Sequence, residues 1–167
     1  MEAMMTSVRW TMLTVLLAAG VSIDHPLQAA PAQTQDASRR LYDRVMEEFR
    51  RKDYEAALAG FRLFLELHGQ SALAANAHFW IGECQFRLGR YKDALASFYN
   101  VVSYYPLSAK LPSATWRIGL AHAKLGDHEK ARLMYERVVN DYPDSAEAEL
   151  ARKALETLAA KDESPRE

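Results

Sequence analysis

A repeat of 37 residues constrains the fold of this 167-residue chain more than any other feature. Aromatic, alanine and serine positions recur at this spacing in three copies, without a gap between copies. A fixed period of this length is typical of proteins in which each copy is one supersecondary unit that buries its apolar face against its neighbours. The recurring positions are Tyr54/Tyr91/His128, Ala57/Ala94/Ala131, Phe61/Phe98/Tyr135, Tyr42/Phe79/Trp116 and Ser71/Ser108/Ser145.

Each copy has the pattern of two helices. In the second copy, residues 73–88 contain no proline and carry apolar residues at helical spacing, and residues 91–104 repeat that pattern. Gly89 between them predicts a left-handed turn, and Pro106 follows the end of the second helix. Ser108 is placed to cap the next helix. Gly82 in mid-helix predicts a close approach to the paired helix, with Ala94 as the small residue facing it.

The spacing of these residues resembles the tetratricopeptide repeat (TPR). The resemblance implies an all-α, TPR-type α-solenoid with three helix pairs, at residues 38–71, 75–108 and 112–145. Residues 146–160 have the pattern of an amphipathic helix, which we expect to cap the solenoid, and residues 161–167 are expected to be a disordered tail. The first copy departs from the pattern, with Val45 in place of glycine and Lys52 in place of the turn glycine. The positions that carry the resemblance are Gly82, Ala94, Phe98 and Pro106, then Gly119, Ala131, Tyr135 and Pro143.

Residues 1–29 have the order of a secretory signal peptide. Arg9 precedes an apolar stretch from Trp10 to Ile23, and Pro26 then breaks this stretch just before Leu27-Gln-Ala-Ala30. The stretch is shorter than the roughly 20 residues that a membrane-spanning helix needs. We therefore expect cleavage after Ala29, a short linker at residues 30–37 and a periplasmic location, with an uncleaved anchor as the alternative.

Composition and motifs argue against catalysis. The 21 basic and 22 acidic residues give a net charge of −1, which provides no broad attraction for nucleic acid. The single cysteine, Cys84, excludes an internal disulfide and lies among apolar neighbours, so we expect it to be buried. The five histidines show no metal-ligand spacing, and no nucleophile or phosphate-binding motif occurs. The prediction is a protein that is not an enzyme and has no cofactor and no metal.

Protein binding is the function that the repeat favours. In a TPR array the first helix of each pair lines a concave groove, so the resemblance implies a set of partner-binding residues there. Aromatic and arginine side chains are the types enriched at interface hot spots. Two readings stay open for the aromatic row Tyr42, Phe79 and Trp116: packing within the array, or direct contact with a partner. The candidate residues are Tyr42, Phe49, Arg50, Asn76, Phe79, Trp80, Glu83, Phe86, Arg87, Trp116, Arg117, Leu120 and Lys124.

A narrower resemblance rests on Ala75-Asn-Ala-His-Phe-Trp-Ile-Gly-Glu83, on residues 61–65 and on Tyr105-Pro-x-Ser-x-Lys110. These segments are similar to the C-terminal domain of the periplasmic TPR proteins of the Tol–Pal system, the cell-division coordinators. The resemblance implies a scaffold or adaptor that binds TolA-like and peptidoglycan-synthase-like proteins, and so links wall synthesis to outer-membrane constriction. Family members carry a trimerising coiled coil before the repeats, which residues 30–37 are too short to form. The alternative is a generic envelope TPR adaptor, for example in outer-membrane protein assembly.

Overall fold

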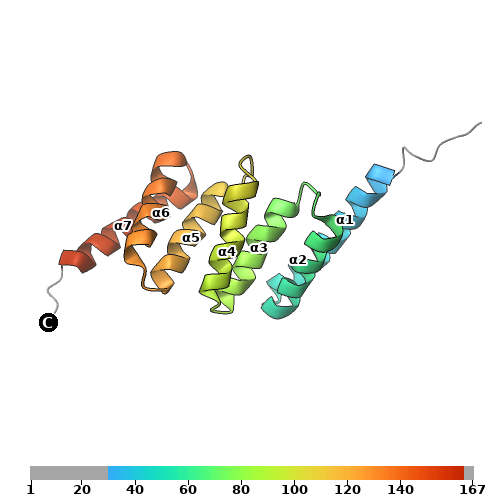
Figure 1. Cartoon of the computed structure of the whole chain (residues 1–167), viewed down its shortest axis with the longest axis horizontal. Helices are drawn as coiled ribbons and strands as arrows, with labels where there is room; N and C mark the ends of the chain where they lie inside the picture. The colour runs from blue at the N-terminus through green and yellow to red at the C-terminus, as the bar shows by residue number, and fades with distance from the viewer. Residues whose placement is uncertain (1–29, 164–167) are drawn as a thin grey trace, which may run out of the picture. The chain divides into compact units, whose positions relative to one another are not determined.

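The computed structural model describes the backbone of residues 30–163 and the side chains of residues 36–160. The described part of the chain is all-α, and consecutive helices from Thr34 onward lie side by side, each packed on the next (Figure 1). The predicted signal peptide at residues 1–29 lies outside this part. The seven helices described are α1 (Ala30–Arg50), α2 (Tyr54–His68), α3 (Ala74–Arg87), α4 (Tyr91–Tyr104), α5 (Leu111–Lys124), α6 (His128–Asp141) and α7 (Ala146–Glu163).

The ends of the array differ from the predicted boundaries. Residues 30–37, expected as a linker, belong to helix α1, which begins at Ala30. Pro31 is compatible with a helix there because the first turn needs no amide donor, and the rest of the helix contains no glycine or proline. At the other end α7 continues to Glu163, so residues 161–163 of the expected tail are helical. Residues 164–167 lie outside the described residues.

The turn within each helix pair has the same hydrogen bonds in all three copies. The residue after the turn donates its amide to a carbonyl five residues earlier, as in Arg90 N to Gln85 O at 2.8 Å and Asp127 N to His122 O at 2.9 Å. Gly89 (φ 74°) and Gly126 (φ 82°) supply the left-handed conformation that the sequence predicted. In the first copy Lys52 takes that conformation, with φ 65°, and is strained because its Cβ disfavours the left-handed region.

Close packing within each pair depends on one glycine. A Cβ added at Gly82 would lie 2.6 Å from Cε1 of Phe98, so the ring of α4, rather than Ala94, occupies the space that the glycine leaves. Gly119 faces Tyr135 in the third pair in the same way. The first pair reverses the arrangement, because Val45 on α1 fills the space beside Gly60 on α2.

The serine column caps only one helix directly. Ser145 precedes α7, and its hydroxyl accepts a hydrogen bond from Ala148 N at 3.1 Å. Ser108, which we expected to cap α5, instead accepts from Lys110 N at 3.1 Å, because a turn separates it from the start of the helix.

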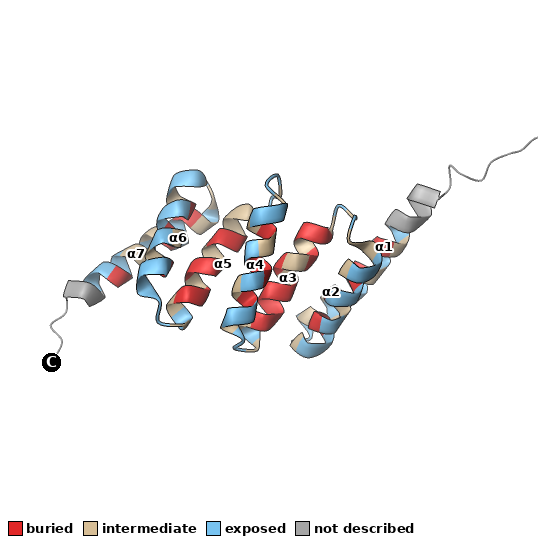
Figure 2. Ribbon diagram, in the orientation of Figure 1, coloured by how far each residue is buried: buried red, intermediate tan, exposed pale blue. Residues whose placement is uncertain are grey.

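Buried side chains lie mainly between neighbouring helices, and the second helices α2, α4 and α6 keep exposed faces (Figure 2). Cys84 is fully buried, as predicted, and burial raises the pKa of its thiol to about 12. Tyr104 of α4 is 74% exposed. No helix in the described range is both long and apolar enough to cross a membrane.

Candidate protein-interaction face

The 13 candidate residues all lie on α1, α3 and α5, the first helices of the three pairs. We call the surface that these helices form the first-helix face. Its helices contact one another directly, through Phe49 and Trp80 between α1 and α3 and through Glu83 and Arg117 between α3 and α5. Beyond α5, the Ser113 hydroxyl donates to a Glu147 carboxylate oxygen on α7 at 2.6 Å.

The aromatic row packs inside the helix pairs. The Tyr42 ring meets the rings of Phe61 and Phe64 of α2 edge-on, with centroids 5.5 and 5.7 Å away. Phe79 contacts Phe98 of α4 at 5.6 Å. Trp116 likewise contacts Tyr135 of α6, with the ring centroids 4.9 Å apart. Of the two open readings for this row, the structure supports packing for all three, and only Trp116 remains half-buried rather than buried.

The contact between α1 and α3, which we call the aromatic seam, is mostly apolar. The half-buried rings of Phe49 and Trp80 lie 4.8 Å apart, and Trp80 packs against the buried cluster that contains Tyr42 and Phe61. Burial raises the pKa of Tyr42, and the neighbouring Trp80 partly opposes the rise. Trp80 therefore holds two repeats together while its remaining surface stays on the face.

The contact between α3 and α5, which we call the charged seam, contains a buried ion pair. Arg117 Nη2 donates to Glu83 Oε2 at 2.9 Å, and Arg117 Nε faces the other carboxylate oxygen. The Glu83 side chain is only 3% exposed, and that of Arg117 is 25% exposed. Burial raises the pKa of the Glu83 carboxyl, whereas the charges of Arg117, Arg87 and Lys110 oppose the rise. The guanidinium of Arg117 also lies 5.6 Å from the ring centroid of Phe86.

Lys110 belongs to this face but was not among the candidates. Its Nζ lies 5.0 Å from the ring centroid of Phe79 and 5.5 Å from that of Trp80. The repeat gave no signal for it, because the equivalent positions 37 residues away are Leu73 and Glu147. Its position seven residues before Arg117 on the same helix face would have been the available signal.

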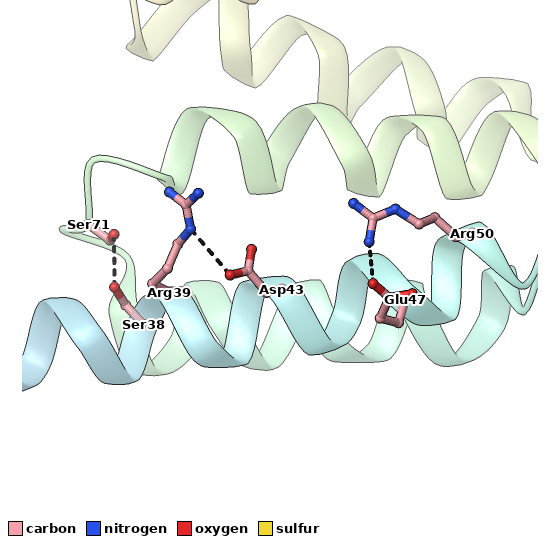
Figure 3. A network of polar contacts seen from close by, with 6 residues as sticks. All are labelled: Ser38, Arg39, Asp43, Glu47, Arg50 and Ser71. Atoms are coloured by element: carbon pink, nitrogen blue, oxygen red, sulfur yellow. Dashed lines mark hydrogen bonds and ion pairs between the residues drawn. The ribbon is translucent and has the colours of Figure 1, made fainter.

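The basic row of Arg50, Arg87 and Lys124 is exposed along its length. Arg50 pairs with Glu47 within α1, and Arg39 pairs with Asp43 on the same side of that helix (Figure 3). Arg87 and Lys124 form no ion pair within the described part of the chain, although Arg87 lies close enough to influence Glu83. Positive charge on the face is therefore balanced locally at α1 and left in excess at α3 and α5.

The two remaining candidates and a nearby histidine lie on α3 and α5. Asn76 and Leu120 are half-buried on α3 and α5. His122 of α5 is buried, with Nε2 3.4 Å from the Tyr99 hydroxyl and Nδ1 3.4 Å from Asp127 Oδ2. Side chains that could together hold a metal ion do not occur in the described range.

Successive helix pairs that are stacked so that first helices contact first helices define an α-solenoid. Models of the tetratricopeptide repeat match residues 42–109 and 113–145, together more than half of the chain. The chain belongs to the TPR family, whose fold is typically a non-catalytic scaffold that mediates protein–protein interactions.

Solved structures agree with this fold. A Yersinia enterocolitica type III secretion chaperone, SycD, in complex with a peptide of the translocator YopD, is 17% identical with a TM-score of 0.67, covering 77% of this chain and 96% of that chain. The first TPR of Spaghetti (RPAP3) bound to an HSP90 peptide is 20% identical with a TM-score of 0.64, covering 76% and 94%. The Arabidopsis OM64 TPR domain is 17% identical with a TM-score of 0.61, covering 74% and 97%. No curated protein matches the chain.

Proposed function

We propose that this protein is a non-catalytic adaptor that binds other envelope proteins on its first-helix face. The observation that carries the proposal is the charged seam, where Arg117 lies 5.6 Å from the half-buried ring of Phe86 and the cations Arg87 and Lys124 on the same two helices are exposed. Arginine and aromatic groups together are typical of interface hot spots. Two similar structures, SycD and RPAP3, hold peptides of other proteins, which supports a peptide-binding role for this array.

The proposed location is the periplasm. It rests on the order of charged, apolar and small residues in 1–29, which is that of a cleavable secretory signal. Fusing residues 1–35 to alkaline phosphatase, which is active only after export, tests it. We expect activity that is lost when Leu16 and Leu17 in the apolar stretch are replaced by arginine. An inactive wild-type fusion would contradict export.

Within the envelope, the proposed role is Tol–Pal-linked coordination of cell division and wall synthesis with outer-membrane constriction. The support is the resemblance of residues 75–83 and 105–110 to the C-terminal domain of that family. TolA-like and peptidoglycan-synthase-like proteins are the proposed partners, and a role in outer-membrane protein assembly is the competing one.

Site-specific photo-crosslinking in living cells separates these roles. A photoreactive amino acid is placed at Arg87 or Lys124 on the first-helix face, with Arg62 and Tyr104 on second helices as controls that are equally exposed. Recovery of a TolA-like protein or wall synthase from the first two positions only supports the full proposal. Recovery of barrel-assembly components would overturn the Tol–Pal role and keep the adaptor role. Crosslinks confined to the control positions, or none at all, would overturn the first-helix face as the binding surface.

A further inference from the structure

Three cations form a stripe along α5. Lys110 precedes the first residue of the helix, Arg117 lies in its middle and Lys124 ends it, each seven residues from the next. Seven residues are nearly two helical turns, so such positions share one face and lie about 10 Å apart along the axis. The contacts agree with this arrangement, because Lys110 and Arg117 both reach rings on α3.

The two helices at the charged seam contain few acidic residues, although Glu147 of α7 hydrogen bonds to Ser113 of α5. Glu83 is the single acidic residue in the sequences of α3 and α5, and its carboxylate is buried and paired with Arg117. Arg87 adds a fourth cation at the same seam. On α1, in contrast, Asp43 and Glu47 neutralise the arginines beside them. At this seam the cations Lys110, Arg117, Lys124 and Arg87 therefore outnumber the one carboxylate of α3 and α5, in a chain whose net charge is −1.

We infer that this stripe binds an acidic protein segment whose carboxylates meet Lys110 and Lys124, about 20 Å apart along the helix axis. The inference rests on the proposed adaptor function and gives the chemistry of its partner. A chain terminus presents one carboxylate group, whereas the cations extend over about 20 Å, so acidic side chains within the segment are needed to match them. The rings of Trp80 and Phe86 beside the cations provide apolar surface for the stems of those side chains.

Fluorescence anisotropy of the purified protein with a defined probe tests the inference. The probe is a fluorescein-labelled 14-residue peptide of alternating glutamate and alanine with an amidated C-terminus, so that it has no terminal carboxylate. Its control has glutamine in place of glutamate. We expect saturable binding of the glutamate peptide, no binding of the glutamine peptide, and loss of binding in about 0.5 M salt because exposed charges are then screened.

Two double variants locate the binding surface. Lys110→Gln with Lys124→Gln removes charge from the stripe, and Arg62→Gln with Lys92→Gln removes the same charge from exposed positions on α2 and α4. We expect about tenfold weaker binding for the first pair and less than twofold for the second. Lys124→Gln alone, at an exposed site, should weaken binding about threefold and serves if the double variant melts early.

Each other outcome overturns the inference. Failure of the glutamate peptide to bind, an equal loss in both double variants, or equal binding of a 14-residue oligothymidine would each contradict recognition of acidic protein by the stripe. If crosslinking from Arg87 and Lys124 in cells still captures envelope proteins, the adaptor function stands and only the acidic chemistry fails. If crosslinking from these positions also fails, the proposed function fails with it.

Discussion

Replacing Gly82 by alanine should destabilise the protein, although alanine is the better helix former. In an exposed helix interior the change would stabilise by about 1 kcal/mol. Here the new Cβ would lie 2.6 and 2.7 Å from two atoms of the Phe98 ring, which is fully buried and packed against Phe79. Overpacking of this kind costs about 1–3 kcal/mol, so the net loss should be about 1 kcal/mol.

Thermal and urea unfolding followed by circular dichroism measure this loss, which corresponds to a fall in Tm of about 3–5 °C for a domain of this size. Phe98→Leu supplies the control, because a smaller side chain on α4 makes room for the Cβ. In the Phe98→Leu background, Gly82→Ala should be neutral or stabilising, a coupling that a double-mutant cycle isolates. A higher Tm for Gly82→Ala in the wild-type background would refute the close-approach reasoning.

Four further substitutions test the left-handed turn and the buried ion pair. Lys52→Gly should stabilise the protein by about 1 kcal/mol, because glycine relieves the strain of the left-handed backbone conformation. Gly89→Ala should destabilise the protein by a similar amount, because it introduces the same strain. A lower midpoint of urea unfolding for Lys52→Gly would contradict this reasoning. At the ion pair, Arg117→Met should cost about 3 kcal/mol at pH 7, because it leaves the buried Glu83 carboxylate uncompensated, whereas Glu83→Gln should cost little. Burial raises the pKa of Glu83 above its usual value of 4.5, so the folded state holds this proton more tightly than the unfolded chain. The stabilisation that Glu83 contributes is therefore present below pH 4.5 and is lost as the pH rises through the raised pKa. Between pH 4 and 7 the urea midpoint of Glu83→Gln should therefore fall less steeply than that of the wild-type protein. An equal pH slope in both proteins would show that Glu83 is not the titrating group.

The helix pairs could be predicted from the sequence because each signal is local and repeated. Gly89 and Gly126 mark the same left-handed turn, and the apolar spacing on either side fixes two helices whichever copy is read. The start of α1 was missed because the linker was placed between the expected cleavage site at Ala29 and the start of the first repeat at residue 38, an interval that contains Pro31. Proline in the first helical turn is compatible with both structures, so the residue itself does not decide between them.

The character of the interaction face could be predicted only in part. Periodicity placed the candidates on α1, α3 and α5, but it treats the copies as equivalent and therefore cannot distinguish the aromatic seam from the charged seam. The difference arises from residues outside the repeating columns, such as Lys110. It also depends on which arginines form an ion pair: Arg50 pairs with Glu47, whereas Arg87 influences the buried Glu83 but forms no ion pair among the described residues. Ion pairing between helices depends on which side chains are neighbours in the fold, and the recurrence of residues along the sequence does not give this information.

The reversed arrangement at Gly60 and Val45 has a consequence for engineering. In the first pair the glycine lies on the second helix, and a side chain of the first helix fills the space beside it. In the other two pairs the glycine lies on the first helix, and a ring of the second helix fills the space. A chimera that pairs α1 with α4 would bring the Val45 side chain against the Phe98 ring, with no glycine between them. A chimera that pairs α3 with α2 would place Gly82 opposite Phe61, and the space beside Gly60 would then be empty. Complete helix pairs are therefore the units that can be duplicated, deleted or exchanged in this protein, and single helices are not.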